Sequence, residues 1–180
     1  MDVLLYSGQA PYFWVKANLD MEKPSVYIPR SGSCLYKALF DVYREGIDVS
    51  SLSFDTIGRR DIVETYRELM LPLSQVNTID YPRYLPYDEI IEYHYNLVKR
   101  GETSAAMTCL TKSYEELKKL KVPCYRVYPT RSMIRRVLGE ALLYGESAKL
   151  KAGQMALILV RVEDIEDDLH NGTSHQLQSL

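Results

Sequence analysis

The stretch Leu52-Ser53-Phe54-Asp55-Thr56-Ile57-Gly58-Arg59-Arg60 joins a short apolar run to the start of a helical pattern through polar residues. The same kind of junction recurs after the apolar runs at 3–6, 26–29, 109–110 and 125–128. An apolar strand followed by Ser, Thr or Gly and then a helix is the repeating unit of α/β proteins. The pattern therefore predicts an α/β fold in which strands alternate with helices and the helices cover the sheet.

Apolar periodicity gives the approximate bounds of these elements. We expect strands over 2–6, 25–28, 51–55, 74–81, 105–110, 124–128 and 154–162, and helices over 12–18, 33–44, 60–71, 87–100, 113–121 and 131–144. The run Met155-Ala156-Leu157-Ile158-Leu159-Val160 is apolar throughout, as in a strand that is covered on both faces. We therefore expect residues 51–162 to form one sheet with 154–162 in its interior.

The chain opens directly on a strand pattern and closes on a polar segment with scattered leucines. This predicts three parts. Residues 1–46 form a partial α/β unit, the end of a larger N-terminal domain. Residues 50–165 form the α/β core. Residues 166–180 form a truncated C-terminal tail.

Charge and composition exclude several classes of partner. Lys and Arg number 22 against 24 Asp and Glu, a net charge of −2, which gives no electrostatic attraction to nucleic acid or to an anionic membrane. No apolar run approaches the roughly 18–20 residues of a membrane span. The three cysteines lack the spacing of a zinc site or a disulfide framework. These features predict a cytoplasmic protein with reduced thiols.

The strand-to-helix junctions are the candidate binding residues. Ligands of α/β sheets usually bind at the carboxyl ends of the strands, where helix N-termini attract anions. The residues predicted to form this anion edge are Ser7, Gly8, Ser31, Thr56, Arg59, Arg60, Thr130 and Arg131. We expect an arginine among Arg59, Arg60 and Arg131 to face a cleft, so that Arg131→Ala weakens anion binding about tenfold. The competing interpretation is ordinary helix capping by Ser and Thr, with solvated arginines.

Signals for catalysis are weak. The sequence contains no phosphate-loop, nucleophile-elbow or zinc-protease motif, and no residue is assigned a catalytic role. Asp55 is the one candidate metal ligand, and the competing interpretation is that it caps the following turn. His94 lies on or beside an apolar helix stripe, which is typical of a structural histidine.

Tyrosine is the unusual residue, with 15 copies against one Trp and three Phe. Tyr81, Tyr84, Tyr87, Tyr93 and Tyr95 cluster within a short segment. Tyrosine suits both a helix packed on a sheet and a contact surface between proteins. A homodimer that buries Tyr84, Tyr87 or Tyr93 is therefore one of the alternatives.

Several stretches together resemble a bacterial family. They are 2–12 (DVLLYSGQAPY), 24–39 (PSVYIPRSGSCLYKAL), 52–60 (LSFDTIGRR), 92–97 (EYHYNL), 105–111 (AAMTCLT) and 122–136 (VPCYRVYPTRSMIRR). The chain resembles uncharacterised bacterial proteins, mostly from Gram-positive species, that are described as transcriptional regulators. The resemblance implies a sensory part of a longer regulator whose output domain lies outside this chain. No helix-turn-helix is evident in the sequence, so direct DNA contact by this chain is not expected.

Residues 50–165 are more loosely similar to the palm-like, ferredoxin-like core of nucleotide and diguanylate cyclases. The glycine-rich acidic hairpin of those enzymes is absent, and only Asp55 could replace one of their metal-binding carboxylates. The similarity thus implies a degenerate domain that binds but does not catalyse.

The leading functional hypothesis is a sensory, ligand-binding regulatory domain without a cofactor. Its ligand would be a small anionic metabolite or nucleotide that binds at the strand-to-helix edge. The first alternative is a cyclase-like, nucleotide-processing enzyme that uses Mg²⁺. The second is a dimerisation module.

Overall fold

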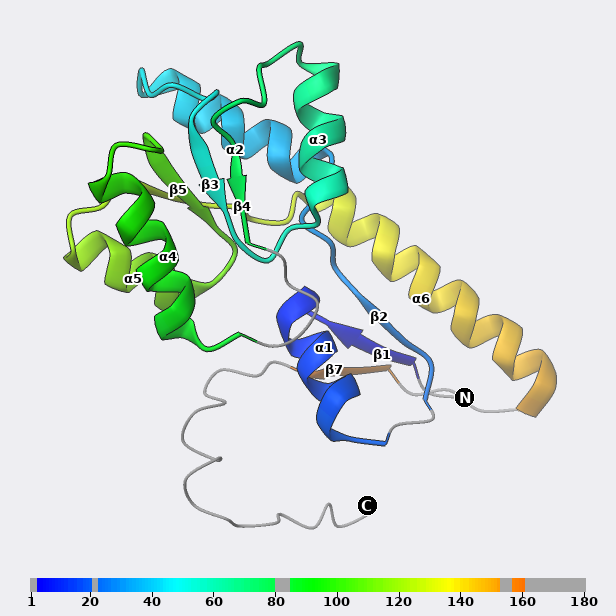
Figure 1. The fold of residues 1–180 in the computed structure, drawn as a ribbon. Coiled ribbons are helices and arrows are strands. Elements are labelled where there is room, and N and C mark those ends of the chain that lie inside the picture. The colour runs from blue at the N-terminus through cyan, green and yellow to red at the C-terminus, as the bar shows by residue number, and fades with distance from the viewer. Residues whose placement is uncertain (1–2, 21–22, 80–84, 153–156, 161–180) are drawn as a thin grey trace.

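The computed structural model describes residues 3–20, 23–79, 85–152 and 157–160, and it confirms an α/β fold (Figure 1). Strands and helices alternate along the chain. The strands are β1 (Val3–Tyr6), β2 (Ser25–Tyr27), β3 (Leu52–Phe54), β4 (Asn77–Thr78), β5 (Ala105–Thr108), β6 (Cys124–Arg126) and β7 (Leu157–Val160). The helices are α1 (Gln9–Asn18), α2 (Ser33–Arg44), α3 (Arg59–Glu68), α4 (Tyr87–Lys99), α5 (Thr111–Lys119) and α6 (Arg131–Ala152).

A three-stranded parallel sheet has the order β2-β1-β7, with Leu5 opposite Val26 and Leu159. Successive side chains of a strand point to opposite faces. Leu4 and Tyr6 accordingly pack with α1 through Val15, whereas Leu5 joins the core cluster that includes α6. Helices α1 and α6 therefore cover opposite faces of this sheet.

A four-stranded parallel sheet has the order β4-β3-β5-β6. Leu52, Phe54 and Met107 face the cluster that contains residues of α2, α3 and α6. Ala106 and Cys124 face the opposite way and pack with Leu117 of α5, and residues of α4 join them. Both faces of this sheet are thus covered, as expected for parallel strands.

The strand expected at 154–162 does form, as β7 over Leu157–Val160, but its expected position is wrong. It pairs with β1 in the three-stranded sheet, where it is an edge strand within the described part of the chain. Helix α6 continues to Ala152, beyond the expected end at 144, and packs against β1 and β2. A continuous apolar run indicates that a strand is buried, but it does not indicate which strand pairs with it.

The finer expectation of a ferredoxin-like, cyclase-like core is also wrong. That core has two strands in succession without a helix between them. In this chain a helix separates every pair of consecutive strands, and all the described strand pairs are parallel. The segment at 74–81 contributes only the two-residue strand β4 to the edge of the sheet.

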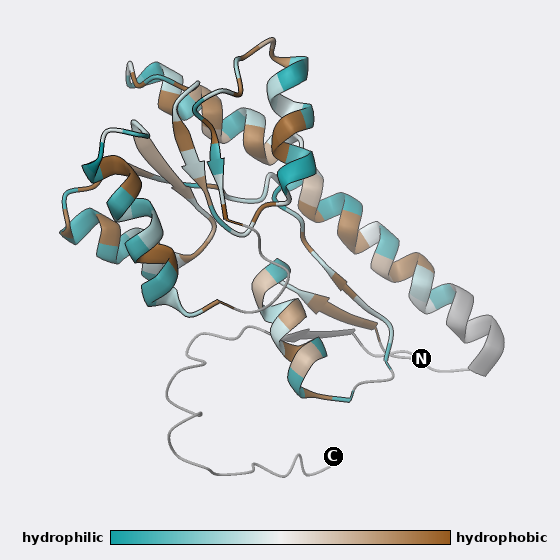
Figure 2. Cartoon of the chain, in the orientation of Figure 1, coloured by the Kyte–Doolittle hydropathy of each residue, from teal (hydrophilic) through white to brown (hydrophobic). Residues whose placement is uncertain are grey.

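The chain passes between the two sheets twice, from β2 through α2 to β3 and from β6 through α6 to β7. The largest core cluster contains Leu5 and Ile28 from one side and Leu52, Phe54 and Met107 from the other. Figure 2 shows that the helices carry both hydrophilic and hydrophobic residues, whereas β1 is mostly hydrophobic. Among the described residues, no helix has the length and apolar character needed to cross a membrane.

Candidate functional site

Polar side-chain interactions join the loops at the carboxyl ends of β1 and β2, and a second set joins those at the ends of β3, β5 and β6. These loops belong to both sheets, since β1 and β2 lie in one and β3, β5 and β6 in the other. We call five residues of these loops and strand ends the carboxyl-edge cluster: Ser7, Arg30, Thr56, Cys109 and Arg126. Each follows or ends its strand, so the parallel order of the strands brings residues far apart in the sequence to neighbouring positions.

Arg30 connects the first two loops. Its Nη2 donates to the carbonyl oxygen of Ser7 at 2.8 Å, and its Nη1 donates to the carbonyl oxygen of Ile28 at 2.9 Å. Its Nε is buried and has no hydrogen-bond partner in the described structure. A Cβ at Gly8 would lie 3.6 Å from Nη2, an ordinary van der Waals contact, so the loop passes directly beside the guanidinium. Arg30 thus retains an unused donor.

Arg126 ends β6 and reaches the β5 loop. Its Nη2 lies 3.4 Å from the carbonyl oxygen of Cys109, and its guanidinium carbon lies 4.5 Å from the centre of the Tyr128 ring. Stacking on an aromatic face favours a cation. Its Nε is buried and has no hydrogen-bond partner in the described structure.

The two arginines form a local excess of positive charge. Burial lowers the pKa of Arg30 from its ordinary value; Cys109 and Cys34 oppose this shift, and the charge of Arg126 makes a smaller contribution in the same direction as burial. Among the described residues, neither guanidinium forms an ion pair with a carboxylate. Half-buried arginines normally have such a partner, because an uncompensated charge is costly to remove from water. An anion would provide the missing compensation.

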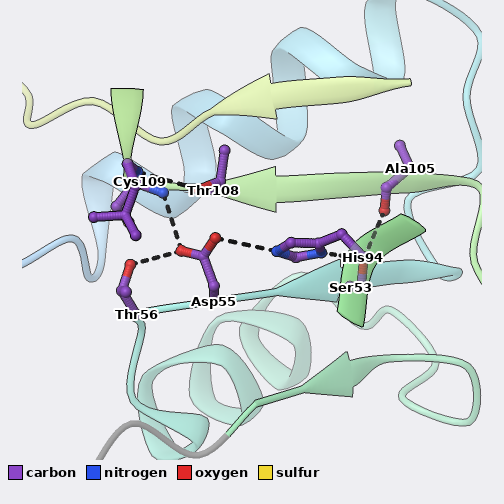
Figure 3. A network of polar contacts seen from close by, with 8 residues as sticks. Ser53, Asp55, Thr56, His94, Ala105, Thr108 and Cys109 are labelled. Carbon is purple, nitrogen blue, oxygen red and sulfur yellow. Dashed lines mark hydrogen bonds and ion pairs between the residues drawn. The ribbon is translucent and has the colours of Figure 1, made fainter. Parts of the chain in front are cut away.

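Asp55 lies behind this cluster in a buried network (Figure 3). Its Oδ1 accepts from the Thr56 hydroxyl at 2.7 Å and from the Cys109 backbone N–H at 3.2 Å. Its Oδ2 lies 3.1 Å from His94 Nε2. The carboxylate therefore connects the β3 and β5 loops to helix α4, and it holds Thr56 and Cys109 in place.

The same network contains a Ser, a His and an Asp, but it lacks the access that catalysis requires. Ser53 Oγ lies 2.8 Å from His94 Nδ1, and His94 Nε2 contacts Asp55. All three residues are 0% exposed. A catalytic serine must reach a substrate carbonyl, whereas the Ser53 hydroxyl is enclosed between β3, β5 and α4. The arrangement agrees with the interpretation of His94 as a structural histidine.

Thr56 has a backbone φ of 46°, in the left-handed region that is uncommon for residues other than glycine. The bond from its hydroxyl to Asp55 stabilises this turn. Strained residues of this kind cluster at binding loops, where the surrounding structure maintains them.

Burial raises the pKa of the Cys109 thiol to about 12, and the charge of Asp55 adds to this effect. The thiol should therefore remain protonated at neutral pH. We expect iodoacetamide at pH 8 to alkylate Cys109 about a hundredfold more slowly than in the unfolded chain, because the lower thiolate fraction outweighs the greater nucleophilicity. Mass mapping of the Cys109 peptide with and without denaturant measures the ratio. A ratio below tenfold would contradict the assigned burial.

The structure brings some of the predicted anion-edge residues together. Ser7 and Gly8 adjoin Arg30, and Thr56 lies beside Cys109. Thr130 accepts from the Met133 N–H at 3.3 Å and so caps α6, which is the competing interpretation of that residue. Its hydroxyl also lies 2.7 Å from that of Ser33, which joins the start of α6 to the start of α2 just after Ser31.

The three arginines that were predicted for the anion edge are not part of the carboxyl-edge cluster. Arg59, Arg60 and Arg131 are exposed, and Arg59 Nη1 lies 3.4 Å from Thr78 Oγ1. Sequence reasoning missed Arg30, Arg126 and Cys109 as members of one site. A signal was present for Arg126, because it is the one charged residue in the strand stretch Cys124-Tyr125-Arg126-Val127-Tyr128.

Within the described ranges, no group of three or more His, Cys, Asp and Glu side chains is placed to hold a metal ion. Both carboxylate oxygens of Asp55, the candidate metal ligand, already have protein partners. Tyr81 and Tyr84 lie outside the described residues, as do His170 and His175. The described tyrosines Tyr93 and Tyr95 are half-buried in α4, where Tyr95 packs in the core cluster beside α5.

The fold and the cluster define a parallel α/β protein whose two sheets contribute loops to one positively charged edge. No family model, no curated protein and no solved structure matches this chain.

Proposed function

We propose that this chain is a sensory domain that binds a small anion at the carboxyl-edge cluster. The observation that carries the proposal is that Arg30 and Arg126, at the carboxyl ends of strands in the two sheets, both lack a carboxylate partner among the described residues. The buried, unpartnered Nε of each arginine supports it. A phosphate or a carboxylate matches the planar donor arrangement of a guanidinium.

The location of the two arginines supports a regulatory role. Arg30 follows β2 in one sheet, and Arg126 ends β6 in the other. An anion held by both would add a connection between the sheets at the point where the chain crosses from one to the other. A ligand shifts a conformational equilibrium only when it binds one arrangement better, and a bridging anion favours the arrangement that brings the two arginines together.

The biological setting remains part of the proposal. It rests on the resemblance to bacterial transcriptional regulators, in which this domain would report the ligand to an output domain. Direct contact with DNA is not included, since the net charge of −2 provides no attraction to phosphate backbones.

A thermal-shift screen tests the proposal. The panel contains inorganic phosphate, sulfate, di- and tricarboxylates, and nucleoside mono-, di- and triphosphates. A ligand at 100-fold excess over its Kd stabilises the folded state by about 2.7 kcal/mol, which for a chain of this length raises Tm by about 5–10 °C. The single variant Arg30→Gln should reduce the shift, while Arg67→Gln on α3 should preserve it.

Two results would contradict the proposal. One is a panel in which no anion raises Tm. The other is an anion whose effect is unchanged in Arg30→Gln. If nucleotides with Mg²⁺ are instead converted to cyclic product or release pyrophosphate, and Asp55→Asn abolishes that conversion, the enzyme alternative replaces this one.

A further inference from the structure

The outer edge of β6 borders a pocket of about 370 Å³. Of the residues that line this pocket, only Arg126 also belongs to the carboxyl-edge cluster. One wall is helix α2 and the other is helix α5. These helices cover opposite faces of the four-stranded sheet, since Tyr125 packs in the cluster that contains α2 and Cys124 packs in the cluster that contains α5. The pocket therefore straddles the open edge of the sheet.

The backbone of β6 offers unpaired groups to this pocket. Val127 N donates to the Thr108 carbonyl, and Ala106 N donates to the Pro123 carbonyl. The backbone groups of residues 123 and 127 thus face β5. Because backbone groups alternate in direction along a strand, those of Cys124 and Arg126 face away from β5. Cys124 is only 1% exposed, so the half-buried Arg126 is the residue whose backbone groups are offered at the outer edge. No partner strand lies there within the described residues.

The side chains around this edge are predominantly basic. The pocket is lined by four cationic residues, Lys37, Arg44, Lys118 and Arg126, and by two acidic residues, Asp41 and Glu45. Asp41 pairs with Lys37, whereas Glu45 accepts from the neutral Tyr125 hydroxyl and keeps its charge, so four cations against two acids leave an excess of two positive charges. Arg44 and Lys118 have no carboxylate partner among the described residues and lie over the rings of Phe40 and Tyr114.

We propose that an extended acidic peptide segment of a partner protein binds here by adding a strand to β6. Strand addition uses main-chain hydrogen bonds for affinity and side-chain contacts for specificity. Side chains of an added strand would alternate between the α2 wall, with Arg44, and the α5 wall, with Lys118. Acidic side chains would find an uncompensated cation on either wall. A second copy of this chain fits poorly, since two basic edges would face each other.

This proposal does not depend on the proposed anion site, because its test uses Arg44 and Lys118, which lie outside the carboxyl-edge cluster. The probe is the labelled six-residue peptide Glu-Glu-Val-Val-Glu-Glu, which carries acidic side chains on both faces when extended, and its binding is measured by fluorescence anisotropy. The expected result is saturable binding with a Kd below about 1 mM, weakened at least about tenfold in Lys118→Glu and in Arg44→Glu.

The matched control is Arg67→Glu, which reverses a charge in the last turn of α3 as Arg44→Glu does in the last turn of α2. The Kd of this variant for the peptide should stay within about twofold of the unsubstituted protein's, which corresponds to a change in binding free energy of about 0.4 kcal/mol or less. Circular dichroism melting verifies that each variant is folded. A backbone N-methylated form of the peptide tests the strand contacts, because it keeps the charges and removes N–H donors. It should bind at least about tenfold more weakly.

Four outcomes would overturn the proposal. They are the absence of saturable binding at millimolar peptide, equal binding of a Val and Lys peptide, equal binding of the N-methylated peptide, and a chain dimer that Lys118→Glu dissociates. Slowed amide exchange of Arg126 on peptide addition would support it directly, since this amide faces the outer edge of β6.

Discussion

Replacing Arg30 and Arg126 together by Gln is expected to weaken binding of the anion identified by thermal shift at least about a hundredfold. A charge-assisted hydrogen bond contributes roughly 1.5–3 kcal/mol, and 1.4 kcal/mol is a factor of ten in Kd. Each arginine has a buried Nε without a partner, so each can add a contact that the unliganded protein lacks. Isothermal titration calorimetry of the two single variants and the double variant measures the loss.

The comparison is the double variant Arg59→Gln with Arg131→Gln, which removes two exposed arginines near helix starts. Its Kd should change by less than about threefold, because exposed charges interact weakly through solvent. If this pair has the larger effect, the anion binds at the helix starts that the sequence predicted and not at the carboxyl-edge cluster. Arg30→Lys separates charge from geometry, since lysine keeps the charge but loses the planar fork.

Asp55→Asn is expected to lower the free energy of unfolding by about 3–5 kcal/mol, because breaking a fully buried hydrogen-bond network is among the most destabilising effects of a single substitution. The Asp55 carboxylate accepts from Thr56 and from the Cys109 N–H, and it contacts His94, all without exposure to solvent. An amide has one oxygen fewer and would place N–H groups against other donors. For a chain of this length the change corresponds to a fall in Tm of about 6–20 °C.

Asp20→Asn is the control, because it makes the same chemical change at an exposed position. Its Tm should move by no more than about 2 °C, as surface substitutions usually change stability by less than about 0.5 kcal/mol. Ser53→Ala should have an intermediate effect of about 1–3 kcal/mol, since it removes the hydroxyl that lies 2.8 Å from His94 Nδ1. A melting curve of Asp55→Asn that matches Asp20→Asn would refute a structural role for the network.

The sequence by itself determined the class of fold and the order of the elements. Local patterns were sufficient because a helix or a strand buries one stripe or face whatever its partner is. The helix expected at 33–44 is α2 with the same bounds, and the other expected elements lie within a few residues of the observed ones, apart from longer helices at α1 and α6 and the short β4. The polar junctions at Ser7, Asp55 and Thr130 are likewise strand-to-helix turns.

Only the tertiary structure decided which elements are neighbours. The run at 157–160 is as apolar as an interior strand, yet β7 pairs with β1, from which it is separated by most of the chain. Arg30 is unremarkable in the sequence, and Arg126 is notable only as the one charged residue of the stretch 124–128. They come together because β2 and β6 end where the chain crosses between the sheets, and the pairing of strands is a long-range property that periodicity does not encode.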